Sequence, residues 1–65
     1  MMAYQIIFLL HLATGANVAS PSIEYYASLA DCESRIEARS AEVARGGSGL
    51  WELKAAACRP VGTPA

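Results

Sequence analysis

The sequence has few of the residues that catalytic and metal sites require. Its 65 residues include one histidine, His11, and two cysteines, Cys32 and Cys58, which lie far apart in the chain. A metal site needs three or four ligands at characteristic spacing, and these residues do not supply it. A catalytic pair of Cys32 and His11 is not expected either, because reactive thiols lie in electropositive clefts and Cys32 lies on an apolar helix stripe. We therefore predict a protein that is not an enzyme and needs no metal or cofactor.

An excess of charge of one sign is also missing. Six acidic and five basic residues give a net charge of −1, and the first basic residue is Arg35. This balance does not favour binding to nucleic acid or to an acidic membrane surface. Acidic and basic residues alternate between positions 31 and 45 in the way typical of a solvated helix face, where Asp31 with Arg35 and Arg39 with Glu42 are ordinary pairs.

Long apolar runs and phosphate-loop signatures are absent. The longest apolar stretch, Ile6 to Ala13, is far shorter than the roughly 20 residues that cross a bilayer, so no membrane span is expected. The segment Gly46–Gly49 is followed by Leu50, whereas a phosphate-binding loop continues with Lys and then Ser or Thr. It is predicted to be a flexible connector.

The most informative stretch is residues 28–45, which predict one amphipathic helix. Ser28 followed three residues later by Asp31 resembles a capping box at the start of a helix. An apolar stripe follows at helical spacing, and Ser40 completes it. The stripe consists of Leu29, Cys32, Ile36 and Val43. Gly46 is predicted to end the helix in a left-handed conformation.

Residues 1–20 allow two interpretations. The first is a buried strand from Tyr4 to Leu12, a turn at 14–17 in which Gly15 or Asn17 takes positive φ, and a short strand at 18–20 that ends before Pro21. The second is a secretory signal peptide cleaved after Ala16 or Ala19. The signal is less favoured, because no basic residue precedes the apolar run and His11 interrupts it.

The C-terminal element is predicted to be a strand within residues 50–60. In the sequence LWELKAAAC the expected inward side chains are Trp51, Leu53, Ala55 and Ala57, and the expected outward ones are Glu52 and Lys54. A short helix is an alternative, since alanine has weak strand propensity. Pro60 is expected to end the element, with residues 61–65 as a tail.

These elements predict a single small α+β domain spanning residues 1–65. The order is strand, short strand, helix, strand, so one amphipathic helix packs on one face of a two- or three-stranded sheet. If the two long strands pair through the helix, they are expected to be parallel with a right-handed crossover. One helix leaves the other sheet face uncovered, and we expect another chain to cover it, most simply a second copy.

The two cysteines allow one intramolecular disulfide, Cys32–Cys58. A chain of this size is marginally stable, so such a bridge, or a partner, is expected to matter. In a reducing compartment the same residues would be small buried hydrophobes.

The chain resembles short uncharacterised orphan proteins of phages and GC-rich bacteria. The resemblance lies in the apolar opening FLLHLATGA, the Ser28 to Cys32 helix start and the closing Cys58-Arg59-Pro60. It implies no activity. We expect a small protein that occupies the surface of a protein partner, as a host-factor inhibitor or an assembly-reinforcing subunit, in the cytoplasm of the host cell if the chain is phage-encoded. The alternative is an exported, disulfide-stapled mini-domain in a secreted or periplasmic location. Large aromatic side chains dominate the energy of interfaces. The predicted contacts are Trp51, Leu53, Tyr25 and Tyr26.

Overall fold

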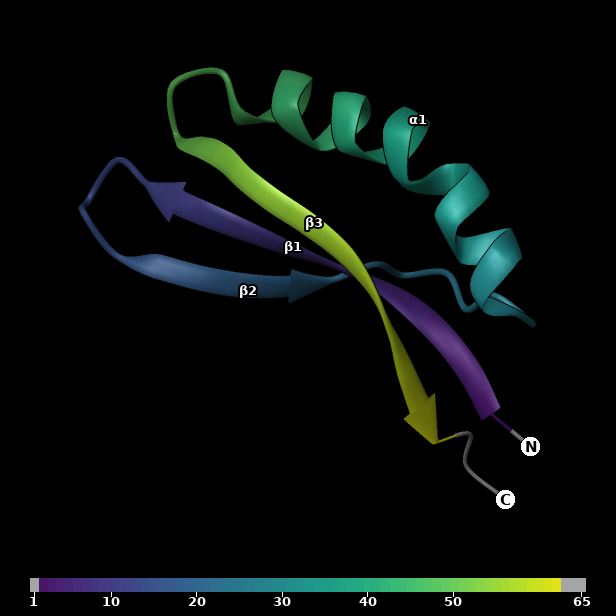
Figure 1. The fold of residues 1–65 in the computed structure, drawn as a ribbon. Helices are drawn as coiled ribbons and strands as arrows, with labels where there is room; N and C mark the ends of the chain where they lie inside the picture. Colours follow the sequence, from purple (N-terminus) through teal and green to yellow (C-terminus); the bar gives the residue numbers. More distant parts are fainter. Residues whose placement is uncertain (1, 63–65) are drawn as a thin grey trace.

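The computed structural model of the chain describes residues 2–62 (Figure 1). It contains strands β1 (Met2–Leu12), β2 (Asn17–Pro21) and β3 (Trp51–Gly62) and one helix, α1 (Leu29–Gly47). The strands form a single antiparallel sheet in the order β2-β1-β3. The helix lies along one side of this sheet, so the predicted α+β architecture is confirmed (Figure 1).

The prediction that the two long strands are parallel is wrong. β1 and β3 pair antiparallel along their whole length, from Met2 opposite Gly62 to Leu12 opposite Trp51. The reason is the direction in which the helix starts. β2 and the segment after it run back beside β1, and Tyr26 and Tyr4 exchange two backbone hydrogen bonds of 2.8 Å near the start of β1. The helix therefore runs in the direction of β1, and β3 must return in the opposite direction.

The β1–β2 hairpin forms as the first interpretation of the N-terminus predicts. Gly15 has φ +98°, and the Leu12 amide donates to the Ala16 carbonyl at 2.8 Å. Of the two residues proposed for positive φ, only Gly15 adopts it. β2 is one residue longer at each end than expected, and Pro21 is its last residue. A proline is tolerated there because β2 is an edge strand.

Helix α1 begins as predicted but ends later. The Asp31 amide donates to the Ser28 side chain at 3.1 Å, which makes Ser28 the N-cap. Gly46 does not end the helix, which continues through Gly47, and Ser48 takes the left-handed conformation at φ 42°. Gly47 serves packing instead. A Cβ built on it would lie 3.0 Å from the Trp51 indole nitrogen.

The apolar stripe of the helix faces the sheet along most of its length. Cys32 is fully buried, and Ile36 and Val43 pack against the core. Leu29 is an exception, because it is 44% exposed at the start of the helix. The helix covers β3 and the adjacent part of β1 and makes no comparable contact with β2.

β3 contains a β-bulge, which the alternating pattern of its sequence does not predict. Leu10 pairs with Leu53 and Leu9 pairs with Ala55, so Lys54 is one extra residue on β3, a β-bulge. Beyond the bulge the alternation is shifted by one. Ala56 and Cys58 face the helix, and the prediction that Ala55 and Ala57 point inward is wrong.

Pro60 does not end β3, which continues to Gly62. The backbone groups of Tyr4, its partner in the register, bond to Tyr26 on the other side of β1. Pro60 is therefore at a position whose nitrogen points away from the sheet, where the missing N–H leaves no ladder bond unmade. Of the predicted tail, residues 61 and 62 belong to the strand, and residues 63–65 lie outside the described part.

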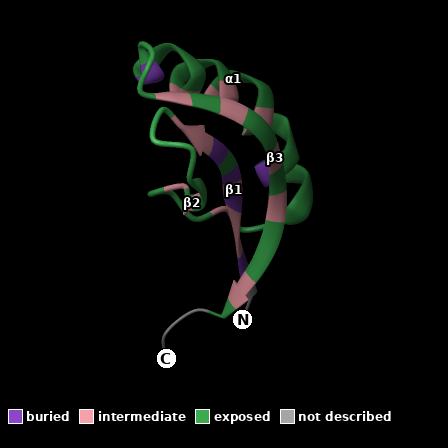
Figure 2. Cartoon of the chain, turned by 90° about the vertical axis from the view of Figure 1, so that its left-hand side faces the viewer, coloured by how far each residue is buried: buried purple, intermediate pink, exposed green. Residues whose placement is uncertain are grey.

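The core lies between β1, β3 and the helix (Figure 2). Its fully or nearly fully buried members are Ile6, Phe8, Leu10 and Cys32. Cys32 and Cys58 form a disulfide with a Cα–Cα distance of 6.1 Å, and this bond ties the first turns of the helix to β3. The loop that it closes contributes about 3.5 kcal/mol on the chain-entropy estimate, a large part of a small domain's stability.

Candidate functional site

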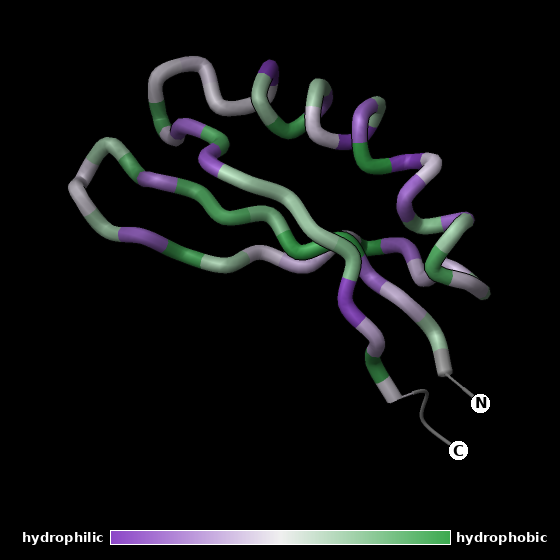
Figure 3. Tube along the Cα trace, in the orientation of Figure 1, coloured by the Kyte–Doolittle hydropathy of each residue, from purple (hydrophilic) through white to green (hydrophobic). Residues whose placement is uncertain are grey.

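The candidate functional site is the sheet face opposite the helix, which we call the outer face. On β1 the even-numbered residues Ile6, Phe8 and Leu10 point toward the helix, so Ile7 and Leu9 point outward. Leu9 is 47% exposed, although it stands in the middle of the central strand. Figure 3 shows the corresponding hydrophobic stretch along β1.

Small apolar residues flank these two side chains in the register. Leu9 lies between Ala19 on β2 and Ala55 on β3, and Ile7 lies between Pro21 and Ala57. None of these register partners is charged, and the charged side chain of Lys54 lies at the border of this central block. Antiparallel sheets that face water on one side usually carry polar residues there, so an apolar outer face is a departure that calls for a covering group.

Polar and charged side chains border the block at both ends of the strands. At one end, the His11 imidazole Nδ1 and the Asn17 Oδ1 are 2.8 Å apart, and Glu52 is the other register partner of His11. At the opposite end Gln5 pairs with Arg59. An apolar centre with a polar rim is the usual anatomy of a protein–protein interface.

A shallow hollow of about 380 Å³ lies beside Leu9 and is lined largely by apolar atoms. It is formed by Leu9, Leu10, Asn17, Val18, Ala19 and Lys54. Lys54 is the bulge residue, and its ammonium group lies 3.2 Å from the Glu52 carboxylate. The hollow therefore has an apolar floor with one ion pair at its border.

The free edges of the sheet are poorly suited to pairing with another strand. On β3 the bulge at Lys54 breaks the ladder, and Pro60 offers no N–H. β2 is only five residues long and ends in Pro21. Bulges, lysines and prolines are the devices by which edge strands avoid edge-to-edge association. This leaves the outer face, rather than an edge, as the surface available to another chain.

The four predicted contact residues have different environments. Trp51 and Leu53 are half-buried and pack against the core, and the Trp51 indole N–H donates to the Val43 carbonyl at 3.0 Å. Tyr26 is also half-buried against the core, whereas Tyr25 is 60% exposed. That these residues contact a partner stays a prediction, and Tyr25 offers the most accessible surface of the four.

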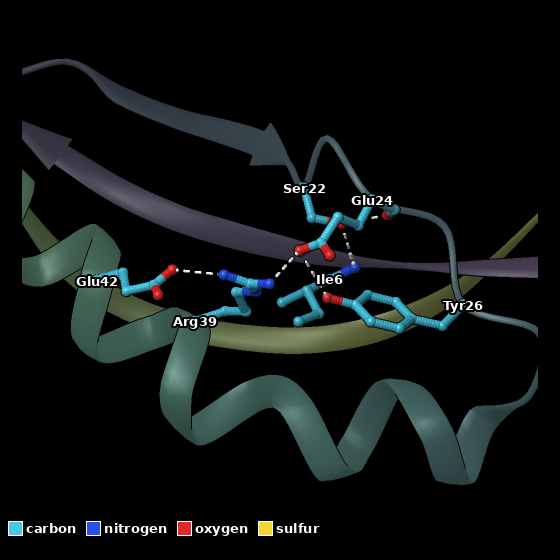
Figure 4. A network of polar contacts seen from close by, with 6 residues as sticks. All are labelled: Ile6, Ser22, Glu24, Tyr26, Arg39 and Glu42. Atoms are coloured by element: carbon cyan, nitrogen blue, oxygen red, sulfur yellow. Dashed lines mark hydrogen bonds and ion pairs between the residues drawn. The ribbon is translucent and has the colours of Figure 1, made fainter.

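A polar network connects the segment before the helix to the helix itself (Figure 4). The Arg39 guanidinium lies 2.8 Å from the Glu24 carboxylate and 2.8 Å from the Glu42 carboxylate. The hydrogen bond to Glu42, the contact with Tyr26 and the charge of Glu24 raise the pKa of Arg39 above its ordinary value. Arg39 is a cation at any ordinary pH, and it fixes Glu24 over the helix. The pair Arg39–Glu42 forms as predicted, and Asp31–Arg35 is not among the ion pairs of residues 2–62.

Ser22 extends this network to the central strand. The Ile6 amide donates to the Ser22 hydroxyl at 3.2 Å, and the hydroxyl donates to the Glu24 carbonyl at 2.8 Å. The Gln5 side chain donates to the Ser22 carbonyl at 2.8 Å. These bonds hold the segment after β2 against β1, and they account for the local order of a stretch that has no helical or strand pattern.

A second hollow, of about 390 Å³, opens where this segment meets the helix. It is lined by Glu24, Tyr25, Tyr26, Ala27, Asp31, Ser34, Arg35 and Arg39. Both carboxylates and both guanidinium groups border it, so the lining has no excess of one sign, and the Arg39 charge is already engaged by Glu24 and Glu42. It favours no particular ligand class.

The cysteines and the histidine that were considered as chemical groups have other partners in the structure. The two sulfur atoms are bonded to each other, so neither cysteine is a free thiol. His11 is at the rim of the outer face with Asn17 as its partner. Within residues 2–62 no three metal-ligating side chains cluster, and the helix does not combine the length and apolar character needed to cross a bilayer.

The sequence predicts an uncovered face of the sheet, but it does not predict which residues of β3 lie on that face. The apolar character of both sides of β1 is visible in residues 6–10, which contain no polar side chain. The prediction that Ala55 and Ala57 point toward the helix is wrong, because one extra residue at Lys54 reverses the alternation after it. The Cys58 position could have signalled the shift, since a sulfur bonded to a helix residue must face the helix.

Comparison with protein-family models, with curated proteins and with solved structures finds no match for the chain.

Proposed function

We propose that this chain is a small non-enzymatic binding protein that acts by occupying the surface of a protein partner. The observation that supports the proposal most directly is the outer face, on which Ile7 and Leu9 stand in an uncharged block bordered by polar residues. Burying the apolar surface of this block against a partner stabilises the complex by about 25 cal/mol for each Å² removed from water.

Two roles are compatible with this mode of action. The chain either inhibits a host factor by masking its surface or reinforces a larger assembly as a subunit, and if the chain is phage-encoded either role is exercised inside a host cell. Tyr25 gives a second point of contact, because its side chain is 60% exposed beside the polar hollow. Tyrosine suits interfaces because its ring is apolar and its hydroxyl is polar.

The Cys32–Cys58 disulfide favours a second candidate function, an exported mini-domain. Disulfides persist mainly in oxidising compartments. Signal cleavage after Ala16 or Ala19 would, however, remove the whole of β1, and with it Ile6, Phe8 and Leu10 of the core. The fold described above depends on those residues. The intact mass of the protein isolated from its native cell separates the candidates, because export by cleavage predicts the loss of 16 or 19 N-terminal residues.

Site-specific photo-crosslinking in the native cell tests the binding proposal. A photoreactive residue at Leu9 places the probe on the outer face, and the same residue at Glu33 places it on an exposed part of the helix. We expect one discrete crosslinked product from the Leu9 position and none from the Glu33 position. No product at Leu9, or the same product from both positions, would contradict the proposal.

A further inference from the structure

We propose that the occupant of the outer face is a second copy of this chain, packed face to face about a two-fold axis that runs along the strands between β1 and β3. The inference rests on the proposed function, because it names the partner of the same surface. It is carried by three observations: the relief of the face, the charges at its rim and the blocked edges.

The outer face has a ridge beside a trough. Ile7 and Leu9 are large and adjacent on one side of β1, and their register partners on β3, Ala57 and Ala55, are small. Directly paired side chains stand about 5 Å apart, so the trough runs beside the ridge over the same length. A surface of this kind is complementary to itself.

Only one orientation of the axis uses this complementarity. A two-fold axis along the strands, between β1 and β3, exchanges the positions of the two strands, so that the Leu9 side chain of each copy lies over Ala55 of the other. An axis across the strands would place β1 over β1, and the two ridges would meet. Face-to-face sheets pack about 10 Å apart with nearly aligned strands, which this arrangement allows.

The charges at the rim agree with the same rotation. Because His11 pairs with Glu52 in the register, the rotation brings Glu52 of one copy opposite His11 of the other. Because Gln5 pairs with Arg59, it brings Arg59 opposite Gln5 at the other end. The Glu52 carboxylate, which also pairs with Lys54 of its own chain, meets an imidazole, and a guanidinium meets an amide, so no like charges are opposed.

The sheet edges do not offer an equivalent contact. The bulge at Lys54 and the proline at position 60 interrupt β3, and β2 is short. Self-association by strand addition is therefore disfavoured, and association through the face is not.

The size of the face predicts a weak dimer. With the axis between β1 and β3, only these two strands of each copy overlap. An overlap two strands wide and seven residues long covers roughly 220 Å² in projection, from a strand spacing of about 4.8 Å and a rise of about 3.3 Å per residue. Stable interfaces bury about 800 Å² per partner. Dimerisation should therefore depend on concentration.

The test is sedimentation velocity on the purified full-length chain with its disulfide intact, over a concentration series. We expect the mass to rise toward twice that of the chain. The variants L9E and A55K should each remain monomeric, and an equimolar mixture of the two should dimerise again. In the mixed pair the L9E carboxylate lies over the A55K ammonium, while the other ridge and trough keep their native contact. The control variant E33K, on the exposed side of the helix, should dimerise as the native chain does.

Three results would overturn the inference: a native chain that stays monomeric at every concentration, an L9E variant that dimerises as well as the native chain, or a mixture that fails to restore the dimer. Far-ultraviolet circular dichroism checks that L9E and A55K are folded. The crosslinking experiment separates this inference from the proposed function. A Leu9 product with twice the chain mass supports both, a product with a different protein overturns only the second-copy inference, and no product overturns both.

Discussion

The two faces of β1 show how the same run of apolar residues can have two different fates. Ile6 and Leu9 are both aliphatic residues in the middle of one strand, yet Ile6 is fully buried and Leu9 is 47% exposed. The difference arises because side chains alternate across a strand, while residues 2–62 contain one helix, which covers one face of the sheet. The covered face therefore holds the monomer together, and the outer face is available for another chain.

The largest effect is expected from truncating the covered face. Ile6→Ala should lower the free energy of unfolding by about 4 kcal/mol, because a fully buried side chain leaves a cavity. The matched change Leu9→Ala should lower it by less than about 1 kcal/mol in dilute solution. Urea unfolding followed by the fluorescence of Trp51, the single tryptophan, measures both. Equal effects would contradict the distinction between the two faces.

Removing the disulfide should weaken the attachment of the helix to the covered face. The double variant C32A/C58A should unfold with about 3 kcal/mol less free energy, since the loop constraint is lost. The native protein in reductant should approach the stability of the variant, and the variant itself should not respond to reductant. Full reduction of the native protein is verified by mass. If the urea midpoint of the fully reduced protein equals that of the oxidised protein, this expectation is contradicted.

The glycines at the end of the helix sharpen the comparison, because Gly47 is buried and Gly46 is exposed. Gly47→Ala should destabilise by about 1 kcal/mol, since the new Cβ would lie 3.0 to 3.3 Å from three atoms of the Trp51 indole. Trp51 cannot move freely, because its N–H is bonded to the Val43 carbonyl. Gly46→Ala meets only an ordinary contact at 3.7 Å and should stabilise by about 0.5 kcal/mol. Thermal unfolding of the two variants checks the opposite signs.

The smallest effect is expected on the outer face of β3. Ala57→Thr should change the free energy of unfolding of the dilute chain by no more than about 0.5 kcal/mol, because the side chain is exposed and threonine suits strands. Ala56→Thr, one residue earlier, enlarges a half-buried side chain packed against the core and should destabilise by about 1 to 2 kcal/mol. Urea midpoints that coincide for the two variants would mean that the register of β3 differs from the one described.

The sequence predicted local features better than it predicted the direction of the strands or the side of the sheet on which each side chain lies. The Ser28 cap, the helix stripe from Cys32 to Val43 and the turn at Gly15 depend on neighbouring residues, and all three form. The antiparallel direction of β3 depends instead on the Tyr26–Tyr4 bridge, which returns the chain to the start of β1 before the helix begins. No local pattern around Tyr26 reports that contact.

The candidate site was predictable in kind but not in detail. A strand that is apolar on both sides implies an uncovered face when only one helix is available, and Ile7 and Leu9 follow from the period of two. The trough does not follow, because the extra residue at Lys54 moves Ala55 and Ala57 to the other side of the sheet. The predicted helix end at Gly46 was also wrong. A glycine near a helix end usually provides positive φ, but here the adjacent Gly47 provides space for an indole ring and Ser48 takes the left-handed conformation.

The bulge at Lys54 makes the disulfide a test of correct strand alignment. If β3 paired with β1 without the bulge, every side chain after position 54 would change sides of the sheet. The Cys58 sulfur would then lie on the face away from Cys32. Only a chain in which the bulge has formed can make the Cys32–Cys58 disulfide. Oxidation would thus selectively trap chains in which β3 is properly aligned with β1, and misaligned chains would keep two free thiols and could still rearrange.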